Sequence, residues 1–316
     1  MSDVAAADRQ SFVYFTNRGS DNFKAALEPI GGRAHRQGDR HIDLLYLDQF
    51  GGETPPKDVS VGFTLIDRQR TIPLDHKAKM ANALIDAGIN YPRVYFDEVD
   101  VPDEPDSLWF IKDPLATAGQ GICVTSREHI ANHFSFGYII QEAVQDLALI
   151  EGKKFTLRAY VLVNQGQLYL FPAGIIVLHG AAYDPGSKDP MVQFEHADYM
   201  DQDSPIKMFP FEDYAPYETV FNDLKSHVIE VFSAFTNLLK YEKANTYCVF
   251  GVDVLVKSDL STVMIEINDR PNIVHTRLVN ERVNIPMVQA WYAVLDPSKA
   301  RRQQTDAVRF ELIANL

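Results

Sequence analysis

The sequence contains little cysteine, which limits the classes of protein it can belong to. Cys123 and Cys248 are the only two cysteines among 316 residues, and they lie far apart. Two isolated cysteines cannot form the disulfide framework of a small secreted domain, and they lack the paired spacing of a cysteine zinc site. We therefore expect a protein of a reducing compartment and predict the cytoplasm.

Basic charge and long apolar runs are also scarce. The chain has 30 Lys+Arg against 43 Asp+Glu, a formal net charge of -13 at pH 7. Proteins that bind nucleic acid or a membrane surface usually present a basic face, so the charge argues against both classes. The longest apolar stretch, around residues 168–178, is interrupted by Pro172 and Gly174 and is too short to span a bilayer. Residues 1–10 lack the apolar core of a signal peptide.

Several common catalytic motifs are missing as well. The sequence has no G-x-x-x-x-G-K-[ST] phosphate loop, no complete G-x-G-x-x-G and no G-x-S-x-G nucleophile turn. Hydrophobic residues make up 46% and charged residues 23%, which is ordinary for a globular protein. At this length we expect about two domains, or one fold of two or three lobes.

The order of the expected elements predicts an α/β protein. An N-terminal lobe of about 70 residues reads as βαβ, from the periodicity of residues 11–16, 23–30 and 41–47. The following elements are expected helices at 75–87, 127–133, 219–241 and 285–295, and expected strands at 93–96, 108–112, 122–125, 138–142, 155–163, 168–171, 249–256 and 262–268. Residues 181–216 are rich in Asp, Pro, Gly and Tyr, and we expect a long mobile loop that covers a site.

Two acids are predicted to meet across a hairpin. Strands 249–256 and 262–268 are joined by a short turn, so Asp253 and Glu266 fall opposite each other, with Asn268 two residues further on. We expect Met264 on the face of Glu266 and Ile265 on the other. Two carboxylates and an amide without a basic residue in either strand suit Mg²⁺. A solvent-facing sheet with scattered polar residues is the alternative.

A second group of residues is cationic. Lys112 ends a strand just before a loop with Gly119 and Gly121, where backbone N–H groups can approach a phosphate. On the strand from Lys154, alternation places Thr156, Arg158 and Tyr160 on the same face as Lys154. Such a cationic strip needs an anion, either a ligand or nearby surface acids.

Five segments occur in the following order along the chain: 74–79 (LDHKAK), 109–114 with 119–122 (WFIKDP, GQGI), 138–142 with 149–158 (YIIQE, LIEGKKFTLR), 250–253 (FGVD), and 265–271 (IEINDRP). Each resembles a motif of the tubulin–tyrosine ligase family, within the ATP-grasp superfamily. The resemblance implies an ATP-grasp fold of the α/β class (α+β lobes). It also implies an N-terminal lobe at 1–73, a central lobe at 74–143 and a C-terminal lobe with the metal site at 144–316.

The resemblance also implies roles for individual residues. ATP would lie between the last two lobes, and its contacts would come from Lys112, Gly119, Gly121, Gln141, Glu142 and Lys154. Asp253, Glu266 and Asn268 would bind Mg²⁺. Arg158 would face the triphosphate end and the acyl group, and we predict the same location for Arg270. The implied reaction joins a carboxylate to an amine through an acyl phosphate.

This chain departs from the family pattern at three places, one of which is Asp113, which separates Lys112 from Pro114 where the family's lysine is followed directly by proline. Thr156 stands where the family has Asp, and residues 172–179 (PAGIIVLH) replace a segment that carries an arginine. An ATP-binding pseudoenzyme that recognises a partner, or a phosphotransferase on the same scaffold, therefore stays open beside the ligase. The charge of -13 disfavours a strongly acidic protein tail as acceptor. We expect a small-molecule or short-peptide carboxylate, with an amino acid or other amine as second substrate.

Overall fold

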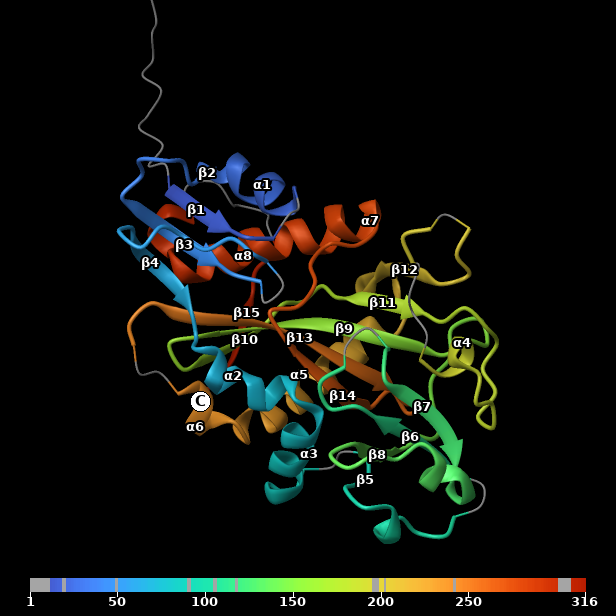
Figure 1. Cartoon of the computed structure of the whole chain (residues 1–316). Coiled ribbons are helices and arrows are strands. Elements are labelled where there is room, and N and C mark those ends of the chain that lie inside the picture. Colours follow the sequence, from blue (N-terminus) through green and yellow to red (C-terminus); the bar gives the residue numbers. More distant parts are fainter. Residues whose placement is uncertain are drawn as a thin grey trace, which may run out of the picture.

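The computed structural model describes residues 12–18, 21–48, 51–89, 92–104, 107–116, 119–194, 199–201, 203–240, 243–300 and 308–316. Two sheets form its framework, with helices on their faces (Figure 1). The larger sheet has eleven strands and the smaller one four, so the α/β class is confirmed. None of the helices in these ranges is long and apolar enough to cross a membrane.

The N-terminal strands form a parallel sheet, as the βαβ pattern predicts. Its elements are β1 (Phe12–Thr16), α1 (Asn22–Leu27), η1 (Glu28–Ile30), β2 (Gly32–Ala34), β3 (His41–Tyr46) and β4 (Ser60–Leu65). The sequence did not predict β2 or β4. β4 pairs with β13 (Thr246–Val256), so these strands continue the C-terminal sheet.

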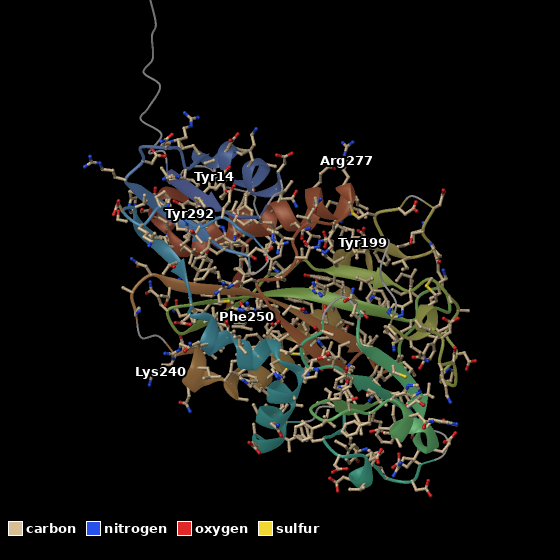
Figure 2. The ribbon with its side chains drawn as sticks, viewed as in Figure 1. Tyr14, Tyr199, Lys240, Phe250, Arg277 and Tyr292 are labelled. Carbon is tan, nitrogen blue, oxygen red and sulfur yellow. The ribbon has the colours of Figure 1, made fainter. Side chains whose placement is uncertain are left out.

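Helix α8 (Ile285–Leu295), from the far end of the chain, covers this parallel sheet beside α1 (Figure 1). The rings of Phe12 and Tyr292 stack with their centroids 4.0 Å apart. Trp291 packs between Phe23 and Tyr46 at 5.7 and 5.2 Å. The burial of these large rings stabilises the packing of α8 on the N-terminal strands. Figure 2 shows Tyr14 and Tyr292 in this same part of the molecule.

The central part carries the smaller antiparallel sheet, in the order β5-β8-β6-β7. Its elements are α2 (Arg68–Asp75), α3 (Lys77–Asp86), β5 (Val94–Tyr95), η2 (Glu98–Asp100), β6 (Leu108–Lys112), β7 (Ile122–Ser126), η3 (Arg127–Asn132) and β8 (Ile139–Glu142). The four predicted strands are confirmed here. A further helix, α2, ends at Asp75, where the predicted helix was to begin. The extended backbone of His76 separates it from α3, and Nδ1 of His76 caps α3 by accepting from the Lys79 N–H.

The C-terminal part supplies most of the large sheet. Its strands are β9 (Phe155–Asn164), β10 (Gln167–Leu170), β11 (Ile175–Leu178), β12 (Lys207–Pro210), β13, β14 (Thr262–Asp269) and β15 (Glu311–Asn315). The predicted hairpins β9–β10 and β13–β14 are both confirmed.

The expected mobile loop at 181–216 is wrong in its last part. Residues 207–210 pair with β11, and α4 (Pro190–Gln193) and η4 (Phe211–Asp213) add helical turns. Met208 and Phe209 pack against opposite cores, which explains why so short a segment forms a strand. Residues 195–198 and 202 of this expected loop lie outside the described residues.

Helices cover both faces of the β9–β13 sheet. α5 (Tyr217–Ser233) turns Leu224, Val228 and Phe232 onto one face, and α8 lies on the other. The remaining helical turns are α6 (Thr236–Leu239), α7 (Arg277–Val279), η5 (Asn280–Asn284) and α9 (Pro297–Ala300). The predicted helix at 219–241 is thus two helices. Phe250, at the middle of the molecule in Figure 2, is fully buried in the core under α5.

Candidate functional site

A cavity of about 450 Å³ is lined by residues of both sheets. This volume falls within the range of about 300–1,000 Å³ that is usual for small-molecule sites. The predicted site residues that line it are Lys112, Gly119, Gln141, Glu142, Lys154, Arg158, Asp253, Glu266, Asn268 and Arg270. The strand pairings therefore bring together residues that lie up to about half the chain apart.

The predicted pairing of Asp253 with Glu266 is confirmed, but the register nearer the turn differs from the predicted one by one residue, because Val256 pairs with Thr262. A bulge follows directly, because Val254 pairs with Met264 and Ile265 is the extra residue. The bulge shifts the alternation by one position, so Met264 lies in the core and Ile265 lines the cavity. The predicted faces of Met264 and Ile265 were therefore wrong.

Neighbouring elements supply cations to both acids. Arg158 on β9 lies in register with Asp253 and donates to its two oxygens at 2.5 and 2.7 Å. Lys77 of α3 places its Nζ 3.4 Å from Oε1 of Glu266. Burial alone would lower the pKa of Arg158, but the charge of Asp253 and its hydrogen bonds outweigh burial and raise that pKa. The absence of a basic residue within β13 and β14 therefore does not by itself require a metal.

The donor set nevertheless fits a hard cation. Asp253 and Glu266 offer carboxylate oxygens, and Nδ2 of Asn268 donates to Asp253 at 3.1 Å, which leaves its amide oxygen available. Among the described residues no group of three His, Cys, Asp or Glu could hold a metal ion, so an all-protein cage is absent there. Two carboxylates and one amide match Mg²⁺, which usually shares its remaining positions with water and phosphate.

Lys112 ends β6 of the smaller sheet, Lys154 directly precedes β9 of the larger sheet, and both amines lie near one ring. Their Nζ atoms are 5.6 and 5.2 Å from the centroid of Phe110. Burial lowers the pKa of Lys112 to about 8, with Glu266 opposing and Lys77 adding to the effect. Burial, with the charge of Lys112, lowers the pKa of Lys154 to about 7. Among the described residues no carboxylate is bonded to either amine, so the two buried lysines form a cationic site that an anion would stabilise.

Gln141 and Glu142 point to opposite sides of β8. Gln141 is buried, its Oε1 accepts from Lys112, and its Nε2 has no hydrogen-bond partner among the described residues. An unpaired amide lining a cavity fits a ligand with acceptor atoms, such as a nucleotide base. Glu142 instead binds Arg93 through both oxygens, at 2.6 and 2.7 Å, and Arg93 also binds Glu104. The Glu142 side chain is thus engaged outside the cavity.

The glycines of the loop between β6 and β7 have left-handed backbones, with φ of 74° at Gly119 and 65° at Gly121. A Cβ on Gly121 would lie 2.9 Å from Cβ of Asp113, so the tight loop requires glycine there. Gly119 lines the cavity, and Phe194, just after α4, lies across from it. The loop and the α4 segment therefore close the same end of the cavity.

The positions that depart from the family pattern are apolar or bonded within the protein. Oγ1 of Thr156 lies 3.4 Å from Nε2 of the buried His179. On β11, Ile175 pairs with Arg158 and Val177 pairs with Thr156, and both side chains line the cavity. β11 belongs to the segment 172–179, which stands in place of the family's arginine-bearing segment, and in this chain it presents apolar side chains to the cavity.

Arg270 lies at the rear of the cavity. Its backbone is left-handed, with φ of 55°, and its guanidinium lies 3.4 Å from the carbonyl oxygens of both Leu47 and Ile66. Its Nε is 3.7 Å from the buried Asp269. Arg270 thus joins the ends of β3 and β4 to β14.

Sequence reasoning missed three cavity-lining or cavity-bordering residues. Lys77 bonds both Glu266 and the Ala116 carbonyl, at 3.4 and 2.6 Å, and it was part of the 74–79 motif without a role. Arg18 and His275 line the cavity from segments that carry no motif. Burial, followed by the charges of Arg158 and Arg18, lowers the pKa of His275 to about 3.

Comparisons with known proteins agree with the order of the motifs. The model of the tubulin-tyrosine ligase family matches residues 66–197 and 212–303, which begins just after β4. A probable tubulin–tyrosine ligase of Schizosaccharomyces pombe (strain 972 / ATCC 24843) is 26% identical over 150 residues. These residues cover 44% of this chain and 37% of that protein, so the alignment spans well under half of the relative.

Proposed function

Because the chain belongs to the tubulin–tyrosine ligase family, we propose that it is an ATP- and Mg²⁺-dependent carboxylate–amine ligase that forms an amide bond through an acyl phosphate. The observation that carries the proposal is the charge pattern of one cavity. The buried Lys112 and Lys154 line the same cavity as the acidic pair Asp253 and Glu266 and as Arg158.

Nucleotide binding rests on the lysines. Lys112 and Lys154 neutralise the phosphates from opposite sheets, while the N–H groups at Gly119 and Gly121 approach them from the loop. Gln141, with its unpaired Nε2, binds the base, and Glu142 contributes its backbone. When bound, Mg²⁺ supplies charge neutralisation at the phosphates, and Asp253, Glu266 and Asn268 hold it.

Turnover rests on positioning and charge. The acceptor carboxylate attacks the γ-phosphorus and ADP leaves. The neutral amine then attacks the acyl carbon, the bond from this carbon to the phosphate oxygen breaks, and the nitrogen loses a proton, which the leaving phosphate can accept. Both steps gather negative charge, which Arg158 and Arg270 stabilise by bidentate hydrogen bonds that a lysine cannot form. None of the cavity residues needs to act as a nucleophile.

The acceptor is proposed to be a small molecule or a short peptide. The S. pombe relative is named for tubulin and tyrosine, but a net charge of -13 repels a strongly acidic protein tail. A neutral or basic carboxylate-bearing molecule, and an amino acid as the amine, suit this charge better.

The test is ADP release from MgATP, measured across a panel of amino acids with small carboxylates and short peptides. A ligase releases ADP over many turnovers only when both substrates are present, because the amine must displace the phosphate before the next cycle, and one ADP accompanies each amide bond. ADP release with a phosphorylated hydroxyl or guanidine product would instead establish a phosphotransferase. Tight ATP binding with no release under any condition would establish the non-catalytic ATP-binding alternative, which the apolar wall at Ile175 favours.

A further inference from the structure

The cavity extends past Arg158 into a part that none of the roles above uses. A strand rises about 3.3 Å per residue, so Arg158 lies about 13 Å along β9 from Lys154. Residues at this far part include Arg18, Tyr199, Asn272 and His275. They contact one another: Asn272 bonds both Arg18 and the Tyr199 hydroxyl, and the rings of Tyr199 and His275 are 5.7 Å apart. Figure 2 shows Tyr199 on the side of the molecule where α7 approaches β11.

Arg18, in the turn after β1, has one guanidinium nitrogen without a hydrogen-bond partner among the described residues. Its Nη1 donates to Oδ1 of Asn272 at 2.7 Å, and its Nη2 forms an ion pair with Asp48. Its side chain is only 12% exposed. Its Nε is buried, so water does not reach it, and it has no hydrogen-bond partner among the described residues. A buried N–H of a cation without an acceptor is costly, and a ligand oxygen would remove that cost.

His275 offers a second donor of known orientation. Its Nδ1 lies 3.0 Å from Nδ2 of Asn284, whose Oδ1 accepts from the Tyr160 hydroxyl at 3.0 Å. The amide nitrogen can only donate, so Nδ1 is the acceptor and the proton of the neutral ring lies on Nε2. The Nε2–H is therefore the group that this buried ring presents to the cavity it lines.

We propose that Arg18 and His275 bind the carboxylate of the amino acid that supplies the amine. One carboxylate oxygen accepts from Nε–H of Arg18 and the other from Nε2–H of His275. The proposal rests on the proposed ligase function and names its second substrate as an α-amino acid. The β11 residue that pairs with Arg158 is Ile175, which carries no charge. The second guanidinium near Arg158 is therefore that of Arg18, which follows strand β1.

The geometry of the reaction assigns this carboxylate to the amine substrate. The acid that is activated must reach the γ-phosphate, next to Arg158 and the acidic pair. The amine approaches the acyl carbon from the side away from the phosphates. Since the carboxylate of an α-amino acid lies two bonds from its amine, it belongs further along the cavity, where Arg18 and His275 lie.

The experiment is calorimetric titration of the full chain with the standard L-amino acids, in the presence of MgCl₂ and a non-hydrolysable ATP analogue. Each amino acid that binds is compared with its carboxamide. The variants are Arg18→Lys, which keeps a cation beside Asp48, and His275→Phe, which keeps a buried ring. Arg33→Lys is the matched control, because Arg33 pairs with Asp39 on the same sheet away from the cavity. Thermal melts confirm that each variant is folded.

We expect the carboxamide to bind about tenfold or more weakly than the acid, and Arg18→Lys and His275→Phe each to lose a similar factor for the acid. Arg33→Lys should match the unmodified protein. If no amino acid binds at millimolar concentration, or if Arg18→Lys binds the acid normally, the proposal is overturned. If the ATP analogue does not bind, the ligase function is overturned. In that case the comparison of amino-acid affinity between Arg18→Lys and the unmodified protein still tests the role of Arg18. If amides are ligated as well as acids and Arg18→Lys raises only the KM of the acceptor, the carboxylate belongs to the acceptor and the assignment is wrong.

Discussion

Arg158 and Asp253 face each other across the β9–β13 ladder and form two hydrogen bonds of 2.5 and 2.7 Å. The same carboxylate accepts from Asn268, so one aspartate links the arginine proposed to stabilise the acyl group with the residues proposed to bind Mg²⁺. Binding of a cation at Asp253 would release part of the charge of Arg158. Under the proposed function, the pair would therefore couple metal binding to carboxylate binding.

The first prediction concerns this pair. Arg158→Gln leaves Asp253 without its partner and should lower the free energy of unfolding by about 2 kcal/mol. The loss is below that of a fully buried pair because the two side chains keep 19% and 13% exposure. Combining it with Asp253→Asn should cost less than the sum of the two single variants. Urea unfolding of all four proteins measures the coupling, and strictly additive effects would mean that the pair contributes nothing to stability.

The second prediction concerns Glu266. Glu266→Gln keeps the size of the side chain and removes one of two facing carboxylates, so the fold should persist while ADP formation falls by about 10²-fold or more. Glu281→Gln is the control, because Glu281 pairs with Arg277 on an exposed helix surface. ADP release as a function of MgCl₂ concentration is the measurement. Normal turnover of Glu266→Gln at low magnesium would remove Glu266 from the metal site.

The third prediction separates binding from stability. Lys112→Met and Lys154→Met each remove a buried amine that burial disfavours, so neither should destabilise the unliganded protein. Each should nevertheless weaken ATP by about 1–3 kcal/mol, because a charged hydrogen bond to phosphate is lost. Lys225→Met, away from the cavity and paired with Glu311, should leave ATP affinity unchanged. Calorimetry with ATP tests this, and unchanged affinity in both cavity variants would contradict the ATP-grasp assignment of the lysines.

The fourth prediction is a pH dependence. Burial lowers the pKa of Lys112 to about 8 and of Lys154 to about 7, against an ordinary 10.5. Between the lowered and the ordinary pKa, the unfolded chain binds more protons than the folded one. This contribution to the free energy of unfolding therefore rises with pH up to about 10.5 and is lost as pH falls toward 7.

Nucleotide binding should show the opposite preference. The phosphates favour charged lysines, so ATP binding near pH 8.5 should take up protons, and affinity should fall as pH rises above about 8. Calorimetry in buffers of different ionisation enthalpy measures the uptake, and Lys154→Met should reduce it. Equal heats in all buffers at that pH would show that the lysines are already charged in the free protein.

Local patterns were sufficient to predict much of this site. Alternation placed Lys154, Thr156 and Arg158 on the cavity side of β9, and turn symmetry placed Asp253 opposite Glu266. The first follows from the two-residue period of a strand and the second from the position of the turn, and both are local features. The bulge at Ile265 was not predictable, because nothing in the turn arithmetic indicates an extra residue.

Contacts between distant segments could not be predicted in this way. The pairing of β4 with β13, which joins the N-terminal strands to the sheet of β9 and β13, depends on segments more than 180 residues apart. Arg18 and His275 lie still further apart along the chain and carry no motif, so the sequence did not indicate that both line the cavity. β12 was not predicted either, because it lies in a segment rich in Asp and Pro and forms a strand through its pairing with β11.

The last prediction tests the acyl phosphate and the role of Arg270. If the acceptor carboxylate attacks the γ-phosphorus, one of its oxygens becomes the bridging oxygen and leaves with the phosphate. With ¹⁸O in that carboxylate, released phosphate should carry one label, which mass spectrometry detects. Unlabelled phosphate together with an amide product would rule out this route.

Arg270→Lys then asks which substrate the guanidinium serves. A lysine keeps the charge near Asp269 but cannot bind a carboxylate through two parallel N–H groups, so the KM of the acceptor should rise far more than that of ATP. The two carbonyl contacts of Arg270, to Leu47 and Ile66, make a second effect measurable. If the melting temperature falls and both KM values rise equally, Arg270 holds β3 and β4 against β14 and does not touch the acceptor. A selective rise in the acceptor KM at unchanged melting temperature would place the guanidinium on the carboxylate.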